Sequence, residues 1–273
     1  MGITKTEKHF DLVSVDVWLN DEITNSFRPP IFMIHGMFAG GWCFEGWAKF
    51  LCEKGCDVYV LKDFHRRFDL SKVKFCHYVD EARSLFGLWV SGIKDIKSRP
   101  IIIGHSMGGL IAQKLAEEYL VRGIVLVASA PPKGISALTF DVTKAMLKHF
   151  IALGLNLPLR LDRKTAFKLI LNQAGKDEYK KYFFEKFVPE SSRVAKQLAF
   201  SRIPVDHRKI ICKSLVVAGF YDKLLPLETQ IKIADKYVSD YLEFQCGHMP
   251  MIESCWERVI SSIYEWINLN FIY

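Results

Sequence analysis

The sequence of 273 residues lacks several features that define common protein classes. No uninterrupted apolar run reaches the roughly 20 residues of a membrane span, and the first ten residues lack the apolar core of a signal peptide. The seven cysteines are odd in number and scattered, unlike a secreted disulfide framework. These absences predict a soluble cytoplasmic protein without stable membrane insertion.

Patterns for nucleotides, nucleic acids and metals are also missing. The sequence contains no P-loop, no G-x-G-x-x-G motif and no helix-turn-helix, RNP or zinc-finger pattern. Cys52 and Cys56 are four residues apart, but no second Cys or His pair follows at zinc spacing. We therefore expect no cofactor, no metal and no nucleic-acid partner. The oligomeric state stays open, with a homodimer among the expectations.

The charge is distributed unevenly along the chain. Lys and Arg number 37 against 30 Asp and Glu, a net charge of +7. Residues 133–208 hold 15 basic and 7 acidic residues, so the excess belongs to this segment. Many aromatic residues lie among its lysines, which indicates solvated helices with a buried aromatic face; contact with a membrane or an acidic substrate is the alternative.

Strand-like and helix-like segments alternate. Runs rich in β-branched residues predict buried strands at Leu12–Leu19, Ile31–His35, Asp57–Leu61, Pro100–Gly104, Gly123–Ala128, Ser214–Gly219 and Tyr241–Gln245. Helix-length stretches lie between them, at Phe44–Lys54, Tyr78–Ile93, Leu110–Tyr119, Leu227–Tyr237 and Ile252–Leu269. This order predicts an α/β fold with a mostly parallel sheet covered on both faces, and an antiparallel hairpin at its edge near the N-terminus.

One segment interrupts the alternation. About eighty residues separate the strand ending near Ala128 from the run beginning near Ser214. We interpret residues 131–208 as a helical cap that lies over the carboxyl ends of the strands, where open α/β sheets bind ligands. Residues 1–130 and 209–273 then form the core. A second independent domain is the alternative interpretation.

A G-x-S-x-G pattern lies at a predicted strand-to-helix junction. Ile101–Ile103 form an apolar strand, Gly104-His105-Ser106-Met107-Gly108 follows, and a helix pattern begins at Leu110. Such a sharp turn strains its corner residue and needs small neighbours, so we expect Ser106 to project its hydroxyl above the sheet. Ser106 is therefore the candidate nucleophile.

A serine nucleophile needs a base, and the base needs an orienting acid. His248 lies in a glycine-containing loop just past the last predicted strand and is the best candidate base. Asp222 follows the preceding strand and is the candidate acid, with Glu228 as the alternative. The chain order Ser, Asp, His agrees with the order in hydrolases that carry a nucleophile elbow.

A tetrahedral intermediate also needs two backbone N–H donors. We predict that Met107, directly after the serine, supplies one and that Met37, in the glycine-rich loop after the first central strand, supplies the other. The residues expected at the substrate are Gly36, Phe38, Trp42 and His105. Trp42 equally fits a place in the core, and His105 one in packing.

Together these motifs resemble the α/β-hydrolase family, in particular its lid-bearing carboxylesterases and lipases. His35-Gly36 with a later Gly-Gly-Trp, Gly-His-Ser-Met-Gly-Gly, Ala-Gly-x-x-Asp and Gly-His-Met-Pro occur in order over nearly the whole chain. The resemblance implies an eight-stranded sheet, a triad of Ser106, Asp222 and His248, and no cofactor. The loop after Leu61, Lys62 to Asp69, departs from the D-x-x-G-H-G of many relatives, which leaves the subfamily open.

The expected activity is hydrolysis of a small-molecule carboxylic ester through an acyl-enzyme. Three alternatives remain for the same fold: C–C bond hydrolysis or cyanohydrin cleavage on the same triad, ligand reception with slow turnover, and a binding protein that only retains the fold. The last would be expected to lack triad members, and all three are present.

Overall fold

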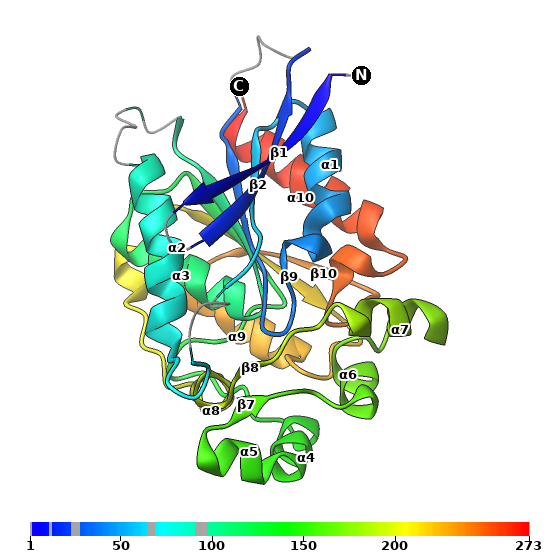
Figure 1. Cartoon of the computed structure of the whole chain (residues 1–273). Helices are drawn as coiled ribbons and strands as arrows, with labels where there is room; N and C mark the ends of the chain where they lie inside the picture. The colour runs from blue at the N-terminus through cyan, green and yellow to red at the C-terminus, as the bar shows by residue number, and fades with distance from the viewer. Residues whose placement is uncertain are drawn as a thin grey trace.

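The computed structural model describes residues 2–10, 13–22, 28–64, 69–90, 95 and 98–272, and its centre is a single large sheet (Figure 1). The strands lie in the order β1-β2-β4-β3-β5-β6-β9-β10. Their bounds are β1 Ile3–Phe10, β2 Val13–Asn20, β3 Ile31–Ile34, β4 Val58–Leu61, β5 Ile101–His105, β6 Gly123–Val127, β9 Lys213–Gly219 and β10 Asp240–Phe244. All pairs from β4 to β10 are parallel. The predicted α/β fold with a mostly parallel eight-stranded sheet is confirmed.

The two faces of the sheet are covered by different helices. The α-helices of the core are α1 Glu45–Glu53, α2 Phe75–Val90, α3 Met107–Glu118, α9 Leu227–Tyr237 and α10 Trp256–Phe271, and short 3-10 turns are η1 Gly41–Phe44, η3 His207–Lys209 and η4 Pro250–Ile252. One hydrophobic cluster contains α1 and α10, and the other contains α2, α3 and α9. This double cover explains why every residue of β3, β5 and β6 is buried and why nearly all of them are apolar.

The edge of the sheet is a long antiparallel hairpin. β1 pairs with β2 from Ile3 opposite Asn20 to Phe10 opposite Val13. The predicted antiparallel edge hairpin is confirmed, and β2 lies in the predicted strand. The residues of β1 were not predicted, because most of its side chains are exposed and no apolar periodicity marks it.

Residues between β6 and β9 form a mainly helical insertion, which we call the cap (residues 131–208). It contains α4 Phe140–Lys148, α5 Phe150–Leu155, α6 Arg163–Leu169, α7 Asp177–Glu185 and α8 Ser192–Ala199, with the two-residue strands β7 Pro158–Leu159 and β8 Glu190–Ser191. Side-chain oxygens of Thr139, Asp162 and Ser191 accept a backbone N–H at the start of α4, α6 and α8. In Figure 1 α4 and α5 lie at the end of the molecule opposite to both chain termini. Across the described ranges, no helix is long and apolar enough to cross a membrane.

Candidate active site

Ser106 occupies the tight turn between β5 and α3. Its φ is 54° and ψ is −119°, a strained conformation for a residue with a side chain. The backbone is fixed on both sides, because Ser106 N donates to the Val127 carbonyl (3.0 Å) and its carbonyl accepts from Ala130 N (2.9 Å). The strain predicted for this turn is therefore present.

The turn closes only because two of its neighbours have no side chain. A Cβ atom on Gly104 would lie 2.4 Å from the Gly108 carbonyl oxygen. One on Gly108 would lie 2.1 Å from the Ile34 carbonyl oxygen at the end of β3. These distances are below van der Waals contact, so the pattern G-x-S-x-G is a steric requirement of this turn.

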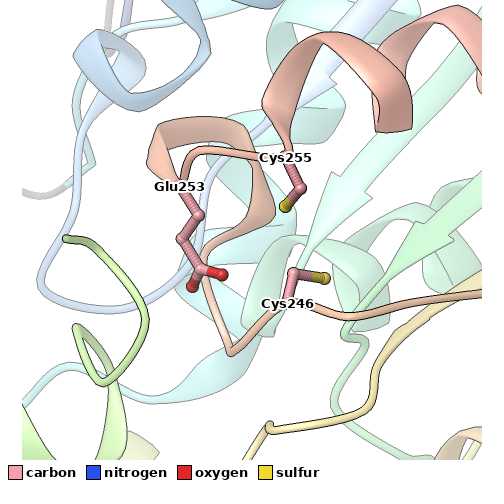
Figure 2. Close-up of side chains that lie close together, drawn as sticks. All are labelled: Cys246, Glu253 and Cys255. Carbon is pink, nitrogen blue, oxygen red and sulfur yellow. The ribbon is translucent and has the colours of Figure 1, made fainter.

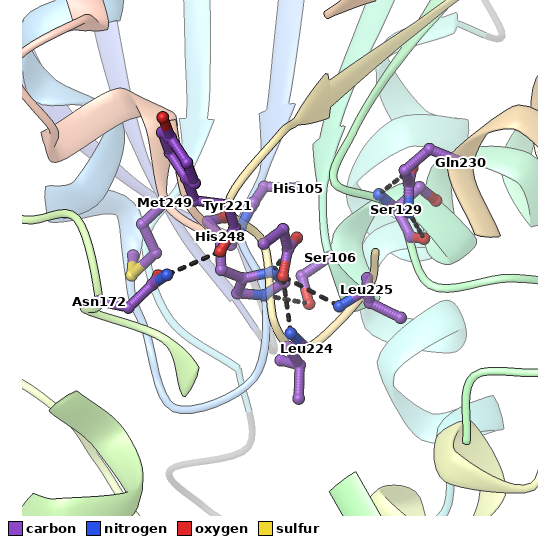
Figure 3. A network of polar contacts seen from close by, with 12 residues as sticks. His105, Ser106, Ser129, Asn172, Tyr221, Leu224, Leu225, Gln230, His248 and Met249 are labelled. Atoms are coloured by element: carbon purple, nitrogen blue, oxygen red, sulfur yellow. Dashed lines mark hydrogen bonds and ion pairs between the residues drawn. The ribbon is translucent and has the colours of Figure 1, made fainter. Parts of the chain in front are cut away.

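A chain of hydrogen bonds joins three residues from distant parts of the sequence (Figure 3). The Ser106 hydroxyl lies 3.1 Å from His248 Nε2, and His248 Nδ1 lies 2.8 Å from Asp222 Oδ2. Because the Asp222 carboxylate accepts, Nδ1 carries the proton and Nε2 is free to accept from the serine. His248 and Asp222 are almost completely buried. The structure thus brings together the three residues predicted as nucleophile, base and acid.

Asp222 is fixed by the turn that follows β9. Its Oδ1 accepts from the backbone N–H groups of Leu224 (2.8 Å) and Leu225 (2.9 Å), which leaves Oδ2 for the histidine. The alternative acid, Glu228, lies in the first turn of α9, and the carboxylate that contacts His248 Nδ1 is that of Asp222.

His105 supports the loop that carries His248. His105 Nε2 donates to the His248 carbonyl oxygen at 2.8 Å, and the two rings lie 4.9 Å apart. Burial, together with the neighbouring His248, lowers the pKa of His105 well below its usual value. His105 therefore stays neutral and acts as a fixed donor to the loop.

The loop after β3 passes directly over the serine. A Cβ atom on Gly36 would lie 2.8 Å from Ser106 Cβ, so the glycine permits this approach. Met37 and Phe38 follow, and Phe38 adopts a left-handed φ of 64°. Met107 is the first residue of α3, where helix N–H groups have no intrahelical partner. The two predicted N–H donors thus lie in the segments on either side of Ser106.

Sequence reasoning missed Glu190, a buried residue of β8 in the cap. Its carboxylate accepts from Phe38 N at 3.3 Å and from the Tyr78 hydroxyl, while Val188 N donates to the Phe38 carbonyl at 3.0 Å. Burial raises the pKa of Glu190 to about 7, and hydrogen bonds from Tyr78 and Phe38 oppose this. The cap therefore holds Phe38 on both sides of its strained backbone.

Glu253 plays a similar part beside the histidine, and it too was not predicted. Its carboxylate accepts from the backbone of Gly247 (2.6 Å) and Met249 (3.2 Å), the residues on either side of His248. Burial raises its pKa. The only sign of this contact in the sequence is a carboxylate five residues after the histidine. That spacing is not typical of any motif, so it could not identify Glu253.

Two thiols lie next to Glu253 (Figure 2). The Cys246 and Cys255 sulfurs and a Glu253 oxygen all lie within 4.8 Å of one another, a donor set of the kind that binds Zn²⁺. Structural zinc needs four ligands, and the Glu253 carboxylate already holds two backbone N–H groups. The contacts that are present assign Glu253 to the support of the histidine loop.

Asn172 connects the cap to the loops of both Asp222 and His248. Its Nδ2 donates to the Tyr221 carbonyl at 2.7 Å, and a Cβ atom on Gly247 would lie 2.4 Å from its Oδ1 (Figure 3). No motif in the sequence of the insertion singled out Asn172. The cap thus contacts the Phe38 loop and both loops that supply the acid and the base.

A cavity of about 150 Å³ lies between the core and the cap. Its lining includes Ser106, His248, His105, Met37 and Phe38 from the core. The cap adds an almost entirely apolar wall, with Val142, Ala145, Met146, Leu153, Leu159, Leu161, Leu169, Ile170, Ala195 and Leu198 and, as polar members, His149 and Thr165. The serine hydroxyl therefore faces an apolar space that suits the hydrocarbon part of a ligand.

Two of the residues expected at the substrate are not among the described residues that line this cavity: Gly36 and Trp42. Trp42 instead stacks on Phe183 of α7, with ring centroids 5.8 Å apart and planes at 14°. It therefore attaches the cap to the core, because its large apolar face finds a partner there. Gly36 permits close approach of the loop to Ser106, as described above.

Known proteins resemble the chain in sequence pattern and in fold. The model of the alpha/beta hydrolase family matches residues 31–261. No curated protein sequence matches the chain.

Solved structures resemble the chain over its whole length. A thermophilic esterase from Thermogutta terrifontis has a TM-score of 0.67 at 17% identity, and an esterase from a Rhodococcus species has 0.66 at 16%; each match covers 99% of this chain and 100% of the other. A monoacylglycerol lipase from Paleococcus ferrophilus has a TM-score of 0.63 at 18% identity, with the same coverage. At these identities the likeness establishes the fold.

Proposed function

The chain belongs to the α/β-hydrolase family, and we propose that it is a serine hydrolase that acts on carboxylic esters. The observation that carries the proposal is the hydrogen-bonded chain from Ser106 through His248 to Asp222, at 3.1 and 2.8 Å. The apolar cavity at the serine supports it further, as do the esterases and lipases among structural neighbours.

In the proposed mechanism, Ser106 Oγ attacks the ester carbonyl while His248 Nε2 takes the hydroxyl proton. Asp222 stabilises the resulting imidazolium through Nδ1–H. The backbone N–H groups of Met37 and Met107 donate to the oxygen that becomes negative. His248 then gives its proton to the leaving alcohol, which departs and leaves the acyl group on Ser106.

Water completes the cycle. His248 removes a proton from a water molecule that attacks the acyl carbonyl, and the bond to Ser106 Oγ breaks as the proton returns to the serine. The products are a carboxylic acid and an alcohol, and neither step requires a cofactor. We also propose a cytoplasmic location, because the cysteines are free and thiols stay reduced in that compartment.

The test is hydrolysis of p-nitrophenyl esters from acetate to palmitate by the wild type and by Ser106→Ala. We expect turnover by the wild type and a loss of several orders of magnitude in the variant. Equal turnover by both proteins would refute the assignment of Ser106. Absence of turnover by folded wild type would favour the C–C hydrolase, cyanohydrin lyase or receptor alternatives.

A further inference from the structure

The outer surface of the cap carries large apolar side chains that face solvent. Two consecutive helices contribute five of them: Phe140 (82% exposed) and Leu147 (69%) on α4, and Phe150 (66%), Ile151 (59%) and Leu155 (68%) on α5. We call these five residues the α4–α5 face. Soluble proteins rarely expose so many large apolar groups together unless the surface binds something.

Helix α4 is apolar on two opposite sides, for two different reasons. Val142, Ala145 and Met146 line the cavity, as the helical spacing of three and four residues allows. Phe140 and Leu147 lie on the other side, seven residues apart and with the exposed Lys144 between them. The cavity accounts for the inner stripe, while the outer one has no partner among the described residues.

The charge around this face identifies its partner. Residues 140–168 contain six Lys or Arg and two Asp, within the basic segment of the chain. The two aspartates already pair with Lys168 and Lys148. Lys144 and Arg160 are exposed and have no carboxylate within salt-bridge distance among the described residues. Exposed Phe, Leu and Ile beside unneutralised cations suit an anionic lipid surface.

A second copy of the chain fits this face less well. In a two-fold dimer the same patch would meet itself, so Lys144 and Arg160 would be brought towards their own counterparts. An anionic bilayer instead offers hydrocarbon for the five apolar side chains and negative headgroups for the cations. We propose that the α4–α5 face is a docking surface for reversible binding to an anionic lipid bilayer. The proposal does not depend on the hydrolase activity.

The experiment is cosedimentation with phosphatidylcholine vesicles that contain phosphatidylglycerol, with vesicles of phosphatidylcholine alone for comparison. The test variant is Leu147→Asp/Ile151→Asp, whose residues lie outside the cavity lining. The matched control is Leu269→Asp/Ile211→Asp, which changes the same residue types at positions 84% and 75% exposed. Leu269 lies near the end of α10 and Ile211 just before β9. Circular dichroism checks that each variant is folded.

We expect the wild type and the control to sediment with the anionic vesicles. The test variant should bind these vesicles at least roughly tenfold more weakly than the wild type. Lys144→Gln/Arg160→Gln should weaken binding to anionic vesicles without changing binding to phosphatidylcholine alone. The proposal is overturned if the wild type stays in the supernatant, if the test variant binds like the wild type, or if the control loses as much binding. It is also overturned if the wild type is a dimer that does not bind vesicles and the Leu147→Asp/Ile151→Asp variant is a monomer.

Discussion

The Glu190 carboxylate of the cap accepts a hydrogen bond from the backbone N–H of Phe38, at 3.3 Å. Phe38 directly follows Met37, the proposed donor to the reacting oxygen, and has a left-handed φ of 64°. Because Glu190 and Val188 bind the N–H and the carbonyl of Phe38, a residue outside the triad fixes the loop that carries the proposed oxyanion donor. This relationship ties the cap to the chemistry.

We expect Glu190→Ala to lower kcat by about tenfold to a hundredfold, with a smaller change in KM, because Met37 would lose its fixed position. Glu190→Gln keeps an acceptor for the Phe38 N–H and should recover most of the loss. Steady-state kinetics on a soluble ester measure both. Equal kcat for Glu190→Ala and wild type would refute a positioning role.

Glu190 also makes stability depend on pH. Burial raises its pKa from an ordinary 4.5 to about 7 in the folded protein. The groups that face it are the Tyr78 hydroxyl and the Phe38 N–H, which lower the pKa, and Glu81, which raises it. Between these pH values the folded protein keeps a proton that the unfolded chain releases, so the free energy of unfolding falls as pH rises. The loss should approach about 3 kcal/mol relative to Glu190→Gln. Urea unfolding at pH 5 and pH 8 tests this, and parallel pH dependences of the two proteins would contradict it.

Asp222→Asn should reduce kcat by about 10³ to 10⁴, because an amide at this position favours the wrong tautomer of His248. The Oδ1 contacts to Leu224 and Leu225 would survive, so the fold should be kept. The matched control is Asp235→Asn on the exposed surface of α9, which should behave as wild type. A similar effect of both substitutions on kcat would argue against the proposed role of Asp222.

The support of the histidine loop can be tested with Glu253→Ala. Loss of the carboxylate leaves the N–H groups of Gly247 and Met249 without their buried acceptor, which should cost about 1–3 kcal/mol of stability for each group. The activity should fall as His248 loses its position. Glu257→Ala, exposed on α10, is the control. Thermal unfolding and kcat are the readouts, and an unchanged melting temperature would show that the contacts carry no energy.

Because the turn at Ser106 has no room for a side chain at Gly108, a glycine-to-alanine substitution should affect stability differently inside and outside this turn. Gly108→Ala should destabilise the protein severely, because its Cβ would lie 2.1 Å from the Ile34 carbonyl oxygen. Gly154→Ala on α5 meets nothing within 4 Å and should be neutral or stabilise by about 0.5–1 kcal/mol. Denaturant unfolding of both variants provides the comparison. Comparable stability of the two would show that the close approach is not required.

The core of this fold could be predicted because its signals are local. Apolar runs mark β3, β5 and β6, which are buried on both faces, and the glycines around Ser106 mark a turn with strict steric demands. The edge hairpin was predicted, but the residues of strand β1 were not, because a largely exposed edge strand needs no apolar pattern.

The contacts that the cap makes could not be predicted in the same way. Glu190 lies 152 residues from Phe38 in the sequence, and Asn172 lies 49 residues from Tyr221. Each is a single side chain whose partner is a backbone group, so neither motif nor periodicity identifies it. For the same reason Trp42 was expected at the substrate, whereas tertiary packing places it on Phe183.

The most direct test of the central claim is reaction with an alkyl fluorophosphonate, followed by mass spectrometry of the digested protein. An activated serine attacks the phosphorus and expels fluoride, so a covalent phosphonyl group should appear on Ser106 of the wild type and be absent from Ser106→Ala. Asp222→Asn should label more slowly. If the folded wild type takes no phosphonyl group on Ser106, or if another residue reacts equally in Ser106→Ala, the proposed serine mechanism is wrong.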